Sequence, residues 1–372
     1  MQLYFMELYK ICKNKAFIRT CIAALVILLL FFWFVEVGDE IATVDGEYFQ
    51  GYEAVQKNRE ITDEFKGVLT DEKLTQIIEK YGFPKVVKEN YPGFRDANYL
   101  TSFAVEHFSD GYMNGWDDYK IATKLYPMEE TEIGKQEKEI SLYYAKGWKV
   151  LFETFQLGMI LGSITILVGI SVVFSQEWQM RMLPLLFTTQ RGKKEDITAK
   201  ILASFTVTIG VYIVVMVLSI TLCYSIFGLD GAQSPYWLVM GENCGLTIPI
   251  REVAGIILAA SLLALLYLCA VTLCVSAHAK STFHSVVVAT ICWGVPVLLR
   301  MIFWGFPFLL VSNTPIFLVM YNNIVERIYF TTFESPIAVM NMYVNVIIIA
   351  FAVIGLIACV INGYRCANRS YE

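Results

Sequence analysis

Long apolar segments constrain this chain more than any other feature of its sequence. A bilayer core about 30 Å thick needs roughly 20 mostly apolar residues in each spanning helix. Hydrophobic residues make up 56% of the 372 residues and charged residues only 17%, whereas soluble domains hold about 25% charged residues. We therefore predict an all-α polytopic membrane protein and exclude disordered, collagen-like and ordinary soluble classes. Six transmembrane helices are predicted, at residues 18–36, 151–175, 200–228, 253–276, 284–306 and 337–362.

Prolines complicate the fifth predicted span. Pro296, Pro307 and Pro315 interrupt an apolar run that reaches Met320. A proline removes a backbone donor, and carbonyls freed at membrane depth need partners from neighbouring helices. We therefore place the fifth span at residues 284–306, and we expect residues 307–336 to form an extracellular re-entrant segment.

Basic residues gather on one set of connections, and this sets the predicted orientation. They precede the first span, fill the connection between spans two and three, include Lys280 between spans four and five, and follow the sixth span in residues 363–372. The opposite connections, Gly228–Glu252 and Ser312–Pro336, hold only Arg251 and Arg327. With six spans, both termini lie in the cytoplasm and residues 37–150 lie outside. We expect a multi-pass membrane protein.

The first apolar segment has an alternative interpretation as a cleaved signal peptide. Its charged start suits either role, but the apolar run ends in WFVEVGDE, without small residues that would mark a cleavage site. We expect the span to be retained. None of the nine cysteines lies in residues 37–150, so an outer domain held together by disulfides is excluded.

Residues 37–150 form the polar part of the chain. From Glu36 to Lys149 there are 23 acidic and 14 basic residues, a net charge of −9. We predict a mostly helical extracellular insert, with helices at Thr70–Tyr81 and Glu129–Leu142, an irregular stretch at Tyr91–Trp116, and no sheet. Either the negative charge attracts cationic ligands, or it follows from the scarcity of Lys and Arg in outer loops.

Catalytic and cofactor motifs are missing from the sequence. The three histidines have no metal-ligand spacing, no G-x-S-x-G occurs, no Asp lies inside a span, and there is no G-x-x-x-x-G-K-[ST] loop. We therefore expect a chain that is not an enzyme, without cofactor or metal and without a nucleic-acid partner. Any ATP-driven work needs another subunit.

The inner connection at residues 176–199 has the most informative sequence. Apolar Trp178, Met182, Leu185 and Leu186 recur at helical spacing, which is typical of an amphipathic helix at the membrane surface. Pro184 would break or kink that helix after its first turn. The alternative is an interfacial loop whose arginines reach toward water.

This connection contains Glu177, then Leu185-Leu186-Phe187-Thr188-Thr189, Arg191-Gly192 and Ala199-Lys200. The run resembles the first inner loop of ABC-2-type transporter permeases, and the resemblance implies a location in a bacterial plasma membrane. The rest is similar in outline: residues 1–17 form a basic amphipathic segment, which we expect to be an interfacial helix, and six spans follow with an insert after the first. Many members have Gly-Thr where this chain has Arg181-Met182, and Pro184 is also unusual.

The resemblance implies a transport mechanism. Such permeases work in pairs, as homo- or heterodimers, and each docks through this loop on a cytoplasmic ABC ATPase subunit that binds ATP and magnesium. It therefore implies an ATP-driven exporter of an amphipathic substrate such as an antimicrobial peptide, antibiotic or lipid. The alternative is a membrane sensor whose extracellular domain recognises a peptide. The implied ATPase-coupling residues are Glu177, Arg181, Leu185, Leu186 and Arg191.

Polar residues inside the spans are the candidates for a substrate pathway. Arg300 lies well within the fifth span, where a charge costs at least about 2.5–3.5 kcal/mol, and Glu153 is a candidate partner. The alternative is that Arg300 reaches the outer headgroups. Asn341 and Asn345 lie one turn apart in the sixth span and either line the pathway or bond between helices.

Overall fold

The computed structural model describes residues 2–86, 94–95, 97–113, 119–131, 134–135, 140–182, 194–236, 248–302 and 336–369. The chain divides into two compact units. We call Met1–Leu28, Phe155–Leu218 and Gly255–Glu372 the helical unit, and Leu29–Thr154 with Ser219–Ala254 the insert unit.

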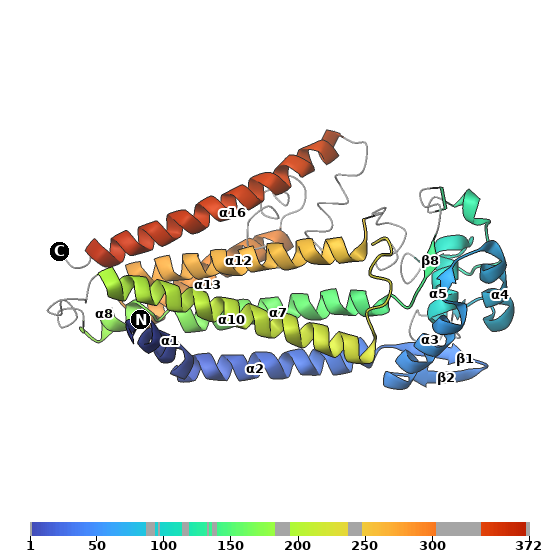
Figure 1. Cartoon of the computed structure of the whole chain (residues 1–372), viewed down its shortest axis with the longest axis horizontal. Coiled ribbons are helices and arrows are strands. Elements are labelled where there is room, and N and C mark those ends of the chain that lie inside the picture. The colour runs from blue at the N-terminus through green and yellow to red at the C-terminus, as the bar shows by residue number, and fades with distance from the viewer. Residues whose placement is uncertain are drawn as a thin grey trace. The chain divides into compact units, whose positions relative to one another are not determined.

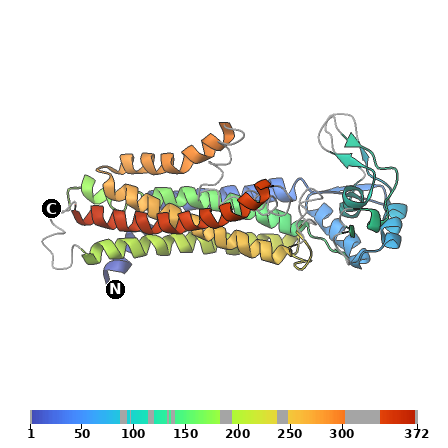
Figure 2. The same ribbon diagram turned by 90° about the horizontal axis from the view of Figure 1, so that it is seen from above.

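The chain is mostly helical, and five helical segments are long and apolar enough to cross a membrane. In Figures 1 and 2 the long helices of the helical unit lie lengthwise beside one another. The predicted fifth span at residues 284–306 overlaps helix α13 (Thr282–Ile302), whose apolar part, Thr282–Pro296, is too short to count among the five. Residues 303–335, which include nearly all of the predicted re-entrant segment at 307–336, lie outside the described residues. The five candidate spans are Lys15–Val37, Lys146–Gln179, Lys194–Ile226, Ile250–His278 and Ile348–Asn368.

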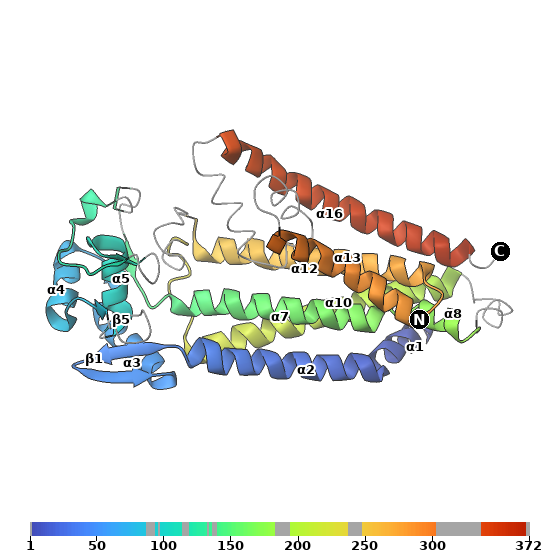
Figure 3. The ribbon, with the colours of Figure 1, turned by 180° about the vertical axis from the view of Figure 1, so that it is seen from behind.

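These spans are built from seven helical elements. The first joins α2 (Lys15–Phe31) to a π-helical turn at Phe32–Val37. The second joins α7 (Lys146–Ile170) to the short α8 (Ser175–Gln179). The others belong to α10 (Lys194–Ile226), α12 (Ile250–His278) and α16 (Pro336–Arg369), which Figure 3 shows from behind.

The N-terminal segment bends before the first candidate span. Helix α1 (Gln2–Lys13) ends one residue before α2 begins. Asn14 separates them, and its Oδ1 accepts the amide hydrogen of Ala16 at 2.9 Å, as expected for a residue that caps a helix start. Residues 15–17, which the sequence placed in the interfacial segment 1–17, therefore belong to α2.

Small residues bring the helices of this unit close together. A Cβ added to Gly158 of α7 would lie 2.5 Å from Val215 of α10, and one added to Gly363 of α16 would lie 3.3 Å from the Cα of Cys274 in α12. Close approach at small residues is the usual way in which membrane helices pack. One cluster of the core is formed by Leu167, Leu268 and Ala289.

The insert unit begins with a hairpin of β1 (Ile41–Val44) and β2 (Glu47–Gln50), in which Val44 pairs with Glu47. Asp45 and Gly46 both have positive φ at its turn, as this tight two-residue hairpin requires. Three helices follow, α3 (Tyr52–Phe65), α4 (Asp71–Tyr81) and α5 (Tyr99–Phe108). The other strand pairs are β3 (Gly67–Val68) with β8 (Ser141–Leu142), β4 (Lys85–Val86) with β5 (Phe94–Arg95), and β6 (Tyr112–Met113) with β7 (Tyr119–Lys120).

The local predictions for the insert have mixed outcomes. The helix at Thr70–Tyr81 is confirmed, since the Thr70 hydroxyl caps α4 by accepting the amide hydrogen of Lys73. The prediction of one helix over Glu129–Leu142 is wrong at both ends, because Met128–Glu130 forms a 3-10 turn and Ser141–Leu142 is strand β8. Residues 134–135 are helical, and residues 132–133 and 136–139 lie outside the described residues. The irregular stretch at Tyr91–Trp116 contains α5, and the prediction of no sheet fails on four two-stranded pairs.

Candidate functional site

The second candidate span is interrupted just before the loop that the sequence singled out. Helix α7 ends at Ile170, residues 171–174 form a turn, and α8 begins at Ser175. The carbonyl of Ser171 accepts hydrogen bonds from the hydroxyls of Ser175 at 2.8 Å, Ser276 at 2.7 Å and Ser285 at 2.6 Å. Hydroxyls from α12 and α13 thus satisfy the backbone at the interruption, as a break in an apolar environment requires.

Helix α8 is joined to its neighbours at both ends. At its start, the amides of Phe174 and Ser175 donate to the hydroxyl oxygen of Ser276 at 3.1 and 3.2 Å. At its end, the side-chain oxygen of Gln179 accepts from the amide and the hydroxyl of Thr282, at 3.1 and 2.7 Å. Helix α8 is therefore attached to both α12 and α13.

A group of charged residues ties α8 to two further helices. The Lys200 ammonium of α10 lies 2.7 Å from the Glu177 carboxylate of α8 and also bonds the Asp196 carboxylate, one turn earlier in α10. Lys10 of α1 lies 3.8 Å from the other oxygen of Glu177 and bonds Glu7. We call these five residues the ion cluster: Glu7, Lys10, Glu177, Asp196 and Lys200.

Burial makes the Lys200 contacts energetically important. The Lys200 side chain is 0% exposed, that of Asp196 5% and that of Glu177 13%. Taking an ammonium out of water costs several kcal/mol unless well-placed opposite charges compensate. Two carboxylates supply that compensation, and the ring of Phe174 lies 5.8 Å from the ammonium. Lys200 is therefore the centre of the cluster.

The end of α8 has an uncommon backbone geometry. The amide of Met182 bonds the Glu177 carbonyl, and the amide of Arg181 bonds the Trp178 carbonyl, both at 3.1 Å. This pair of bonds is a Schellman motif, whose left-handed residue is usually glycine. Here that residue is Arg181, with φ of 52°. Its side chain is exposed. An exposed arginine therefore occupies a backbone position that favours glycine.

The structure places the predicted coupling residues in three different settings. Glu177 is half of a buried ion pair, and Arg181 is exposed at the end of α8. Leu185, Leu186 and Arg191 lie outside the described residues.

The predicted pathway residues are not brought together among the described residues. Glu153 belongs to the insert unit, where its side chain contacts that of Glu36. Arg300 is in α13, and Asn341 and Asn345 are in α16, but their side chains lie outside the described residues.

The sequence interpretation missed the partners of Glu177. Lys200 is predicted only as part of the Ala199-Lys200 pair that resembles the permease loop. Asp196, Ser276 and Ser285 are not among the predicted residues. A signal was present: Asp196 and Lys200 are four residues apart at the start of an apolar helix. That spacing brings the two charges together on one face.

A second buried polar group lies in the insert unit. One oxygen of Glu40 accepts from the Asn58 amide at 3.0 Å and the Tyr144 hydroxyl at 3.1 Å, and the other lies 3.0 Å from Lys146. Burial, followed by the Glu40 charge, raises the pKa of Tyr144 well above its ordinary value. These bonds join residues far apart in sequence, and we assign them a structural role.

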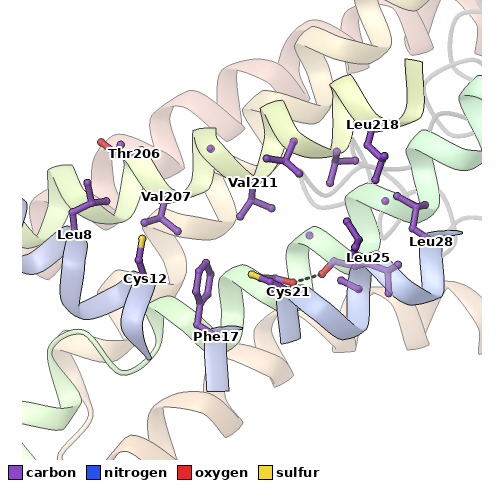
Figure 4. A pocket seen from close by; sticks show the side chains of 18 residues that line it. Leu8, Cys12, Phe17, Cys21, Leu25, Leu28, Thr206, Val207, Val211 and Leu218 are labelled. Atoms are coloured by element: carbon purple, nitrogen blue, oxygen red, sulfur yellow. Dashed lines mark hydrogen bonds between the residues drawn. The ribbon is translucent and has the colours of Figure 1, made fainter. Parts of the chain in front are cut away.

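Two cavities border the N-terminal helices within the helical unit. One, of about 510 Å³, is next to the ion cluster and is lined by polar and apolar residues, among them Lys13, Lys15 and Val173. The other is an apolar groove of about 430 Å³, along which Leu8 and Cys12 of α1 and Leu25 and Leu28 of α2 face Val207, Val211 and Leu218 of α10 (Figure 4).

Comparisons give no independent assignment. No family model, curated protein or solved structure matches the chain. Within the described residues, no three His, Cys, Asp or Glu side chains are grouped so as to hold a metal ion.

Proposed function

We propose that the chain is the membrane-spanning permease subunit of an ABC-2-type exporter that moves an amphipathic substrate with energy from a separate cytoplasmic ATPase. The proposal includes six spans, both termini in the cytoplasm of a bacterial cell, and pairing with a second permease. Its basis is the resemblance around residues 174–202 together with the attachment of α8 to four other helices.

The attachment of α8 is the observation that carries the proposal. A transport subunit that receives force through the loop after α8 needs a stiff connection from that loop to its spans. Glu177 connects α8 to α10 through Lys200 and to α1 through Lys10, while Ser276 and Thr282 connect it to α12 and α13. Hydrogen-bonded and ionic networks of this kind pass a displacement between elements.

The test is stimulation of an ATPase. The full chain is co-expressed with a separate ATPase subunit that contains a phosphate-binding loop, and ATP hydrolysis by the purified pair is measured in proteoliposomes. Reversing Arg191 to Glu is expected to abolish stimulation while membrane insertion is retained. Glu177 is changed only to Gln, because a positive charge beside buried Lys200 would disturb folding. We expect Glu177→Gln to lower stimulation severalfold.

The matched control is Glu252→Gln, which removes an exposed acid from the first turn of α12, outside the inner connection at residues 176–199. It is expected to leave stimulation unchanged. An ATPase that copurifies and is fully stimulated by both the Arg191→Glu and Glu177→Gln proteins would overturn the coupling role.

A membrane sensor is the second candidate. It is favoured by the compact insert unit, which has its own buried core of residues such as Val55, Leu74 and Phe108. A sensor binds its ligand but moves none. Accumulation of a substrate peptide inside inverted vesicles only when ATPase and ATP are present would exclude it.

A further inference from the structure

The cavity beside the ion cluster has a mixed lining. Lys13, Asn14 and Lys15 line it from the joint between α1 and α2. The region around α8 contributes four apolar residues and two polar ones: Val172, Val173, Met180, Met182, Gln176 and Glu177. The volume is about 510 Å³. Lysines that face a mostly apolar side suit a ligand with an anionic group on an apolar body.

The charges around this cavity do not balance. Its two acids are already matched, because Glu7 bonds Lys10 and Glu177 bonds Lys200. In the described part of the chain, neither Lys13 nor Lys15 forms an ion pair; Lys13 instead lies 4.7 Å from the ring of Tyr9. The ion cluster itself has three acids and two lysines, a net charge of −1. Lys13 and Lys15 bring the net charge around the cavity to +1.

The outer surface of α1 indicates where the cavity lies. Phe5, Tyr9 and Cys12 are exposed and follow one another at helical spacing, whereas Glu7 and Ile11 on the other side are buried. A helix with an exposed apolar stripe and terminal lysines is typical of the membrane interface. This step depends on the predicted placement of α1 at the membrane surface and not on the transport function.

We propose that this cavity binds the phosphate group of an anionic phospholipid. The ammonium groups of Lys13 and Lys15 meet the phosphate, and the glycerol end of the lipid packs on Val173 and Met180. Lysines near a membrane surface attract anionic lipids individually, but a cavity with an apolar wall adds a fixed place for one molecule.

The experiment measures lipid binding to the purified full-length chain in a neutral detergent. The probe is phosphatidylglycerol with a fluorescent label on one acyl chain, and phosphatidylcholine with the same label is the neutral comparison. Phosphatidylglycerol is expected to bind more tightly. Lys13→Gln and Lys15→Gln are each expected to weaken it about fivefold, and the Lys13→Arg and Lys15→Arg variants to retain it.

Lys280→Gln is the matched control, because Lys280 is an exposed lysine between α12 and α13 that does not line the cavity. Met180→Trp narrows the cavity without changing its charge and is expected to weaken binding as well. Equal binding of the two lipids would show that the site does not recognise the anionic charge. An equal loss of binding in Lys280→Gln would show nonspecific attraction to surface lysines. Either result would overturn the site. Displacement by millimolar inorganic phosphate would assign a soluble anion instead and overturn the lipid.

Discussion

At the residue scale, Lys200 shows how one buried charge depends on its partners. Its ammonium is held by Glu177 and Asp196 with no exposure of the side chain. Removing only one member of a buried ion pair leaves uncompensated charge, whereas replacing all members by neutral groups restores balance. The loss of stability that a substitution causes here therefore depends on which charged partners remain.

Lys200→Met is expected to lower the free energy of unfolding by about 3–5 kcal/mol. The measurement is detergent-induced unfolding of the purified chain, followed by circular dichroism. Lys194→Met is the control, since Lys194 is exposed on the same helix. Adding Glu177→Gln and Asp196→Asn to Lys200→Met is expected to recover most of the loss. Equal stability of the Lys194→Met and Lys200→Met proteins would contradict a buried ionic centre.

His107 of α5 is expected to make the insert less stable in acid. Burial lowers the pKa of His107 from 6.5 to about 3, so below about pH 6.5 the unfolded chain binds a proton that the folded chain does not. Stability therefore falls as pH decreases from about 6.5 to 3, by about 1.4 kcal/mol per pH unit. Hydrogen exchange of α5 measures this, and His107→Phe is expected to remove that part of the slope. An unchanged slope would refute it.

At the element scale, the helices differ in how far the residues within each helix determine that it forms. Apolar length and the Thr70 and Gly82 caps are local properties, which is why the long helices and α4 were predictable. Helix α5 was missed because it is buried on most of its surface and shows no apolar stripe, although Asn98 and Thr101 form a capping box.

The remaining errors come from contacts between distant residues. Ser141–Leu142 pairs with Gly67–Val68, so strand pairing overrides the helical preference of the acidic segment before it. In the candidate site, the sequence indicated Glu177 but not its partners, because Lys200 and Ser276 are 23 and 101 residues away from residues that they bond in α8.

The Schellman ending of α8 leads to a prediction about Arg181. Arg181→Gly is expected to stabilise the chain by about 1 kcal/mol, because a left-handed conformation costs a residue with a Cβ about that much. Detergent-induced unfolding measures the change. Arg181→Ala keeps the Cβ and removes the charge, so it is expected to give no comparable gain. If both variants stabilise equally, charge rather than backbone conformation is the cause.

At the scale of the whole molecule, the direction of the chain in the membrane is the decisive property. The basic connections predict Lys280 in the cytoplasm and the insert outside. In a cysteine-free background, Tyr52→Cys of the exposed surface of α3 is expected to react with an impermeant maleimide on intact cells. Lys280→Cys is expected to react only after permeabilisation. The reverse pattern would invert the topology and remove the basis for a cytoplasmic loop after α8.

The Ser171 carbonyl also sets an order of events during synthesis. Its partners Ser276 and Ser285 follow it by 105 and 114 residues. At about 5–20 residues per second, the ribosome needs roughly 5–20 s to reach them. During synthesis, the second candidate span therefore lacks the hydrogen bonds from Ser276 and Ser285 until α12 and the start of α13 have been made. A binding partner that recognises α8 only when these hydrogen bonds have formed therefore binds only chains whose translation has passed that point.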